Sequence, residues 1–90
     1  MSKPILIILS GPPATGKSLL AAMMKEGYCI EEFPHRLREA ELCEARKRDL
    51  VVICTQRLDL TLRHPAFKSL KRGRVLFSFS LNRYAQEVNP

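Results

Sequence analysis

The sequence predicts an α/β fold, a three-layer sandwich in which helices cover both faces of a mostly parallel sheet of four strands. Short apolar runs alternate along the chain with stretches of helical spacing, which is the pattern of βαβ units. The chain has 90 residues, enough for one domain with a thin core. We therefore expect a single minimal domain over residues 1–90, in which residues 82–90 form a tail.

The first half of the chain is expected to form a strand, a helix and a second strand. Ile5–Leu9 is an unbroken apolar run, as in a central strand covered on both faces, and Ser10–Gly16 follows as a loop. Lys17–Glu26 has helical spacing, and Gly27 is its expected C-terminal cap. The apolar residues available for burial in this helix are Leu19, Leu20, Ala22 and Met23. Tyr28–Phe33 is the expected second strand, which is short.

The second half is expected to add two helices and two strands. Arg36–Arg48 has helical spacing, and Leu50–Cys54 is apolar throughout, like the first strand. A short helix is expected to begin at Pro65 and to end at Gly73. Its inward-facing residues are expected to be Phe67 and Leu70. Arg74–Leu81 shows a two-residue alternation, which predicts an edge strand with one partly solvated face.

Residues 11–18 read G-P-P-A-T-G-K-S and match the phosphate-loop pattern G-x-x-x-x-G-K-[ST] in full, between an apolar strand and a helix. Gly16 lets the backbone curl so that successive N–H groups point at phosphate oxygens, and the positive end of the following helix adds to this field. Lys17 is expected to contact the β- and γ-phosphates, and the Ser18 hydroxyl to bind Mg²⁺. The motif therefore predicts a domain that binds ATP, or another nucleoside triphosphate, with Mg²⁺. The expected nucleotide contacts are Gly11, Pro12, Pro13, Ala14, Thr15, Gly16, Lys17, Ser18 and Leu19.

The same loop resembles the G-P-P-G-T-G-K-[ST] loop of AAA+ ATPases and of some nucleotide kinases, with Ala14 where glycine is usual. The resemblance implies a P-loop NTPase, most similar to the AAA+ or additional-strand ATPases. Residues 28–32 form an apolar run that ends in two acids and resembles a Walker B strand. In that resemblance Glu31, where Asp is usual, holds Mg²⁺ through water, and Glu32 is the general base. Two acids at a strand end are also common solvent-facing residues, so this alternative stays open.

Two later segments extend the resemblance. Residues 51–57 are similar to the sensor strand of these ATPases, which implies that Gln56 or Thr55 positions water near the γ-phosphate; the alternative is a polar turn after a buried strand. The segment from Arg57 to Arg74 has the layout that follows the sensor, which implies an arginine finger for a neighbouring subunit at Arg72 or Arg74. The chain lacks the room for a helical lid, so it resembles a reduced P-loop core.

The net charge of +6 is divided unequally along the chain. Residues 1–45 hold five Lys or Arg and six Asp or Glu, a net of −1, whereas residues 46–90 hold ten and three, a net of +7. This asymmetry predicts a polyanionic partner, with nonspecific nucleic acid as the expected class; the alternative is a basic surface that only keeps the protein in solution. The densest group is Arg57, Arg63, Lys68, Lys71, Arg72 and Arg74, of which Lys68, Lys71 and Arg72 are expected to share one helix face.

The sequence gives no sign of a membrane partner. Its first apolar run is too short to span a bilayer, and a phosphate loop follows where a signal peptide would have a cleavage site. We therefore expect a cytoplasmic protein. The three cysteines, Cys29, Cys43 and Cys54, have no C-x-x-C spacing and are expected to be buried thiols in a reducing compartment.

Four functions follow from these features. The first is a weak Mg²⁺-dependent NTPase that needs oligomerisation or a protein partner to complete its site. The second is a non-catalytic module that uses the nucleotide as a regulatory or structural ligand. The third is a nucleic-acid-binding accessory protein whose basic half makes the contacts. A small-molecule kinase is the fourth, and it is disfavoured because no segment for an acceptor or a lid is visible.

Overall fold

The computed structural model describes residues 3–13 and 15–81, so the expected contact of Ala14 and the expected tail 82–90 lie outside the described residues. The elements in chain order are β1 (Ile5–Ser10), α1 (Lys17–Met23), β2 (Tyr28–Ile30), α2 (Glu39–Arg46), β3 (Leu50–Thr55), α3 (Leu58–Arg63), α4 (Pro65–Lys71) and β4 (Val75–Ser80). The predicted alternation of strands and helices is therefore confirmed.

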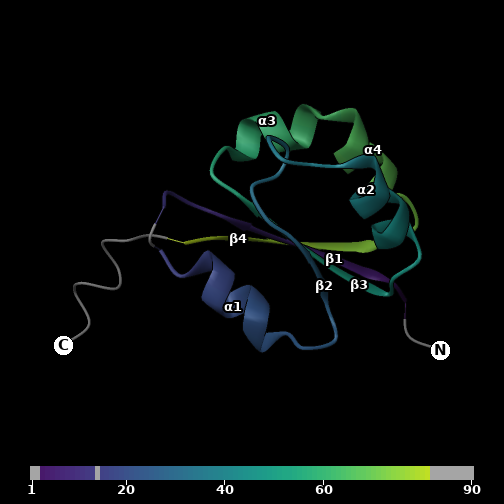
Figure 1. Cartoon of the computed structure of the whole chain (residues 1–90), viewed down its shortest axis with the longest axis horizontal. Coiled ribbons are helices and arrows are strands. Elements are labelled where there is room, and N and C mark those ends of the chain that lie inside the picture. The colour runs from purple at the N-terminus through teal and green to yellow at the C-terminus, as the bar shows by residue number, and fades with distance from the viewer. Residues whose placement is uncertain (1–2, 14, 82–90) are drawn as a thin grey trace.

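The strands form one sheet in the order β2-β3-β1-β4, and all of its pairings are parallel. The expected α/β class is confirmed, with a sheet that is wholly rather than mostly parallel. Figure 1 shows α1 on one face of the sheet and α2, α3 and α4 on the other. Because parallel strands end at the same edge of a sheet, the loops after β1, β2 and β3 meet there.

The core lies on both faces of the sheet. On one face, Leu6 and Ile8 of β1 pack in a cluster with Phe67 and Leu70 of α4, and each of the four side chains is at most 1% exposed. On the other face, Leu9 packs in a second cluster that includes three further buried residues. These are Ala21, Val52 and Cys54. The expected burial of Phe67 and Leu70 is confirmed, and the central strand β1 is covered on both faces as its apolar run predicts.

Helix α1 is shorter than expected and turns a different side to the core. It ends at Met23, where a helix to Glu26 was expected, because the next N–H, of Met24, donates to the Ala21 carbonyl in a tighter turn. The side chains of Leu19 and Met23 are 69% and 68% exposed, so their expected burial is wrong. The residue that α1 buries fully against the sheet is Ala21, because a small side chain lets the helix approach β3 closely.

Gly27 is not the cap of this helix. Its φ is not positive, and its N–H donates to the Met24 carbonyl in the turn that leads to β2. A Cβ at this position would lie 3.1 Å from the Val52 side chain. The glycine is therefore explained by the close approach of this turn to β3, and not by a left-handed helix end.

Three further differences from expectation concern β2, α2 and α3. Strand β2 ends at Ile30, where a strand to Phe33 was expected, and Glu32 has a left-handed φ of 54°. Helix α2 begins at Glu39 and not at Arg36. Helix α3 was not expected at all, because its six residues include only a short apolar pattern and Pro65 follows closely. It forms because its own residue Thr61 is fully buried and donates a hydrogen bond to Thr55 at the end of β3, which is a tertiary contact.

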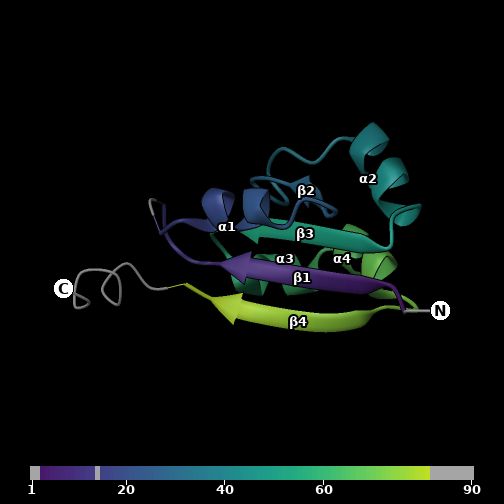
Figure 2. The same ribbon diagram turned by 90° about the horizontal axis from the view of Figure 1, so that it is seen from below.

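Strand β4 is an edge strand, as expected, but it lacks the expected dry face. The parallel register aligns Val75, Phe77 and Phe79 with β1 residues that alternate toward the α1 side of the sheet. Phe77 and Phe79 are 46% and 50% exposed, and all six residues of the strand are exposed. Figure 2 shows why: α1 lies toward β3, and within residues 3–13 and 15–81 no helix covers β4 on this side. We call Val75, Phe77 and Phe79 the β4 strip.

These exposures give a test of the fold with one matched pair of substitutions. Phe67→Ala removes a ring that is 1% exposed, and the free energy of unfolding should fall by about 3–5 kcal/mol, enough to unfold much of so small a domain. Phe77→Ala removes a ring that is 46% exposed and should change it by less than about 1 kcal/mol. Urea unfolding followed by circular dichroism measures both. Equal losses in the two variants would contradict the assignment of the core.

Candidate functional site

The loop after β1 depends on two glycines with positive φ. Gly11 has a φ of 150°, and a Cβ there would lie 2.5 Å from the carbonyl oxygen of Leu81. The Gly11 N–H donates to the Thr55 carbonyl at 3.2 Å, which ties the start of the loop to the end of β3. Gly16 has a φ of 88° and directly precedes Lys17, the first residue of α1. The spacing of the motif therefore places glycine at two positions where other residues would be strained.

The loop is closed by side chains on its own carbonyls. The Thr15 side chain is 1% exposed, and its hydroxyl donates to the Pro12 carbonyl at 2.8 Å. The Lys17 ammonium donates to the carbonyls of Gly11 and Pro12, each at 2.7 Å. An ammonium has three protons, so one donor of Lys17 remains for an anion at the mouth of the loop. Lys17 thus lies across the loop, at the position where the motif requires a positive charge.

Ser18 and Glu31, the two expected metal ligands, are in direct contact. The Ser18 hydroxyl donates to Glu31 Oε1 at 2.7 Å, although β3 separates β2 from β1 in the sheet. Helix α1 bridges this gap, because it packs against β3 and brings its first turn toward the end of β2. A hydroxyl and a carboxylate are oxygen donors of the kind that Mg²⁺ prefers. Within residues 3–13 and 15–81, no group of three or more His, Cys, Asp or Glu is placed to hold a metal, so the remaining ligands would have to be phosphate oxygens or water.

A cavity of about 510 Å³ opens where the loops after β1, β2 and β3 meet. Its volume lies in the range of small-molecule sites. The lining residues are Pro13, Gly16, Lys17, Ser18, Leu19, Glu31, Glu32, Cys54, Thr55 and Gln56. The structure therefore brings into one cavity residues of the phosphate loop, the two acids after β2 and the polar end of β3, which the sequence places up to 43 positions apart (13 to 56).

Glu32 lines the cavity but already has a partner. Its Oε2 lies 3.0 Å from Nε of Arg36, and the two side chains are 53% and 79% exposed. This ion pair was not expected, because the sequence predicted Arg36 at the start of a helix and not in the turn after β2. An exposed pair of this kind contributes little to stability and exchanges readily with water. Glu32 is thus near the cavity, as the resemblance implies, and its carboxylate is shared with a guanidinium.

Of the two candidates for the sensor role, Thr55 already makes hydrogen bonds within the chain. Its hydroxyl accepts hydrogen bonds from Thr61 Oγ1 at 2.8 Å and from the Arg57 N–H at 3.1 Å, and it donates to the Arg57 carbonyl at 3.2 Å. Thr55 is 1% exposed, so this network fixes the turn between β3 and α3. Gln56 is exposed and lines the cavity. Gln56 is therefore the one of the two whose side chain can reach a ligand.

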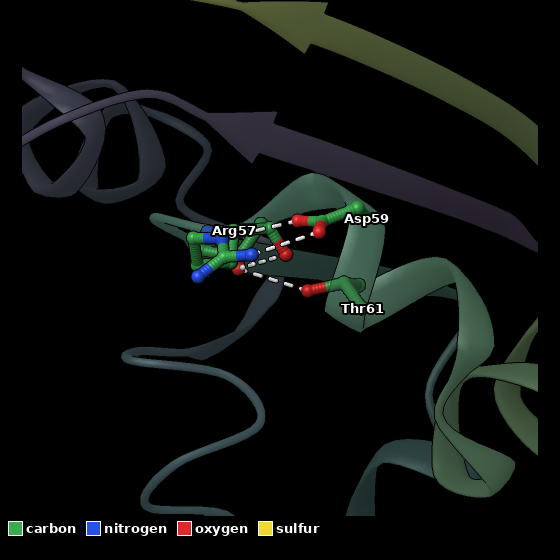
Figure 3. A network of polar contacts seen from close by, with 4 residues as sticks. Arg57, Asp59 and Thr61 are labelled. Carbon is green, nitrogen blue, oxygen red and sulfur yellow. Dashed lines mark hydrogen bonds and ion pairs between the residues drawn. The ribbon is translucent and has the colours of Figure 1, made fainter.

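An arginine that was assigned only to the basic half lies beside the cavity. Arg57 donates from Nε to Asp59 Oδ1 at 3.1 Å and from a terminal nitrogen to Oδ2 at 2.9 Å, as Figure 3 shows. This pairing lowers the pKa of Asp59 and raises the pKa of Arg57. Arg57 also lines a small hollow with Glu32 and Gln56. The sequence does not distinguish Arg57 from the other arginines, and only the fold shows that it lies beside Glu32 and Gln56.

The two arginines expected to form a finger lie far from this chain's own cavity. Arg74 directly precedes β4, at the amino ends of the strands. Its guanidinium donates to the Ala45 carbonyl at 2.9 Å and to the Arg46 carbonyl at 3.4 Å, at the end of α2. Arg72 lines hollows at the same end of the sheet. Arg74 therefore stabilises the end of α2, a role that the sequence did not indicate.

The amino ends of the strands form a separate basic surface. Two adjoining hollows of about 340 and 510 Å³ lie there and share Arg72 and Arg74. The cationic residues that line them are Arg46, Lys47, Arg48, Lys68, Lys71, Arg72 and Arg74, which we call the basic surface. Lys68, Lys71 and Arg72 line one hollow, but the expected common helix face is wrong for Arg72, because α4 ends at Lys71 and Arg72 is extended. Arg57 and Arg63, in contrast, do not line these hollows, so the expected cluster is divided between two regions.

No protein-family model, curated protein or solved structure matches this chain. Among the described residues, no helix has the length and apolar character needed to cross a membrane.

Proposed function

We propose that this chain is a reduced P-loop nucleotide-binding domain that binds a nucleoside triphosphate with Mg²⁺, ATP in the first instance. The observation on which the proposal rests is the convergence of Lys17, Ser18 and Glu31 at one cavity behind a loop with the full motif. A lysine ammonium suits phosphate oxygens, and the hydroxyl–carboxylate pair suits Mg²⁺. The strand order supports the resemblance to the additional-strand ATPases, because β3 lies between the strand before the loop and the strand before the acids.

The residues present fit the nucleotide and its metal. Lys17 has one proton not engaged by the loop carbonyls, and a triphosphate would compete for the other two, since charge-assisted bonds are the stronger. Ser18 and Glu31 would hold Mg²⁺, and the metal would supply charge neutralisation on the phosphates. Helix α1 has only seven residues, so the loop N–H groups and Lys17 would contribute more than its dipole.

We further propose weak hydrolysis that another chain must complete. Glu32 is the proposed base and Gln56 the residue that orients water; Glu32 must first leave Arg36. Because the cavity is open to solvent, water is not excluded and transition-state charge is only partly met. The β4 strip and the free edge of β4 support the need for a second chain, since exposed apolar edges favour association. The alternative is a non-catalytic nucleotide-binding module.

Nucleotide binding should depend on Lys17. Lys17→Ala removes the ammonium at the mouth of the loop, and affinity for Mg·ATP should fall by about tenfold to a hundredfold, as expected for a lost charged hydrogen bond. Titration calorimetry measures the affinity, and circular dichroism checks that the variant is folded. Lys25→Ala, an exposed lysine outside the cavity, is the matched control. An unchanged affinity in folded Lys17→Ala, or no binding by the wild type, would defeat the proposal.

Hydrolysis, where it occurs, should depend on Glu32 and on protein concentration. Glu32→Gln keeps the shape of the side chain but removes the base, so phosphate release should stop while Mg·ATP still binds. If a second copy completes the site, the turnover per wild-type chain should rise as the protein concentration rises. Glu26→Gln, an exposed acid outside the cavity, serves as the control. Equal turnover by wild type and Glu32→Gln would remove Glu32 from the mechanism and leave the non-catalytic alternative.

A second candidate function is nonspecific binding of nucleic acid at the basic surface. Its cationic residues line adjoining hollows at the opposite end of the strands from the cavity. A phosphate backbone would meet this surface through counterion release, without contacts that read base sequence. Because the two sites are at opposite ends of the sheet, one chain can hold a nucleotide and a polyanion together.

Charge reversal of the shared helix face tests this second function. The variant with Lys68→Glu, Lys71→Glu and Arg72→Glu should lose retention of DNA at low salt, measured by a filter or gel-shift assay, and still bind Mg·ATP. The control has the same net charge but spares the basic surface: Lys25→Glu, Arg38→Glu and Arg63→Glu. Equal retention by the two variants would show that only the net charge matters. No retention by the wild type would exclude the function.

A further inference from the structure

Two of the three cysteines lie in contact beneath the first turn of α1. Cys29 of β2 and Cys54 of β3 have their sulfur atoms 3.9 Å apart. The register pairs Cys29 with Val52, so Cys54 is two residues further along the neighbouring strand and points to the same face of the sheet. A disulfide needs the two sulfurs at about 2.05 Å, so its formation requires the side chains to rotate and β2 to shift slightly against β3. The third thiol, Cys43, is exposed on α2, so its expected burial is wrong.

The two thiols differ in environment and in access. Cys54 is 3% exposed but lines the cavity, and its Sγ lies 3.8 Å from the Lys17 carbonyl oxygen. Cys29 is half-buried and lines an adjoining hollow with Glu31 and Glu32. The S–H of Cys29 stabilises a thiolate on its neighbour and so lowers the pKa of Cys54, and the nearby Lys17 ammonium acts in the same direction.

We propose that Cys29 and Cys54 are a peroxide-oxidisable dithiol that forms a reversible disulfide in the wall of the cavity. The cavity admits a molecule as small as hydrogen peroxide to Cys54. The Cys54 thiolate attacks one peroxide oxygen, which gives a sulfenic acid and hydroxide. The Cys29 sulfur then attacks the Cys54 sulfur, the S–S bond forms, and the hydroxyl leaves as water with the Cys29 proton. Two thiols are oxidised by two electrons, and one peroxide is reduced.

Cys54 lines the cavity that is proposed to bind the nucleotide, so oxidation of the dithiol and nucleotide binding are linked. This link rests on the proposed function. A nucleotide in the cavity would cover Cys54 and slow its oxidation, because both occupy the space beside Lys17. The disulfide, in turn, would draw Cys54 from the Lys17 carbonyl and shift β2 just before Glu31, the partner of Ser18. Oxidation and nucleotide binding should therefore oppose each other.

The dithiol itself is tested without a nucleotide. The reduced Cys43→Ser variant, whose remaining thiols are Cys29 and Cys54, is treated with hydrogen peroxide and examined by mass spectrometry after alkylation. We expect loss of the mass of two hydrogens, a cross-linked peptide that joins Cys29 to Cys54, and full recovery with dithiothreitol. Cys29→Ser in the same background should stop at a sulfenic acid on Cys54, detected with dimedone. Folded Cys43→Ser that forms no such cross-link would overturn the proposal.

The link to the nucleotide has a separate readout. With Mg·ATP at ten times its Kd, the oxidation rate should fall about elevenfold, the factor by which the free protein is depleted. In Lys17→Ala, whose affinity is expected to be tenfold to a hundredfold lower, the same concentration of Mg·ATP should slow oxidation by at most about twofold. If the disulfide forms but Mg·ATP does not slow it in a wild type that binds Mg·ATP, the link is overturned and the dithiol stands. If the wild type does not bind Mg·ATP at all, the proposed function fails and the cross-link still decides the dithiol.

Discussion

The parallel pairing of β1 with β3 is the constraint on which the rest of this structure depends. The register runs from Ile5 beside Leu50 to Ser10 beside Thr55, so the two strands end at the same level. The hydrogen bond from the Gly11 N–H to the Thr55 carbonyl continues this pairing by one step into the loop. The phosphate loop therefore begins where the polar end of β3 begins. A slip of this register by one residue would move the core residues of β1 to the opposite face and separate the two loops.

Three charged or polar side chains of the cavity have partners within the chain. Lys17 is held by loop carbonyls, Ser18 by Glu31, and Glu32 by Arg36. Among the described residues, no buried side-chain nitrogen or oxygen lacks a hydrogen-bond partner. A ligand would therefore exchange hydrogen bonds with the cavity, and neutral groups would gain little from such an exchange. A multiply charged ligand gains more, because each exchanged bond becomes charge-assisted.

The helices cover the two faces of the sheet unequally, which explains why β4 is exposed. The two ends of the strands also differ in the side chains that they gather. One face is packed by α2, α3 and α4, and the other by α1, whose seven residues extend only about 10 Å. Strand β4 therefore exposes its aromatic rings, although its sequence pattern is that of a half-buried strand. The carboxyl ends of the strands gather acids and one lysine, whereas the amino ends gather the basic surface. The basic residues thus predominate at the amino ends, whereas the acids at the carboxyl ends lie beside Lys17 and Arg36.

The sequence by itself determined the strands, most helices and the positions of the loop glycines. Apolar runs and turn residues act over a few positions, so β1, β3 and the glycines of the loop followed directly from them. Contacts between distant residues decided the rest. Which side of α1 is buried and the contact of Cys29 with Cys54 depend on which strands are neighbours. The burial of Thr61 in α3 depends on packing against the end of β3, and the ion pair of Glu32 with Arg36 depends on the turn after β2. Strand order is set by packing of the whole chain, and no local pattern records it.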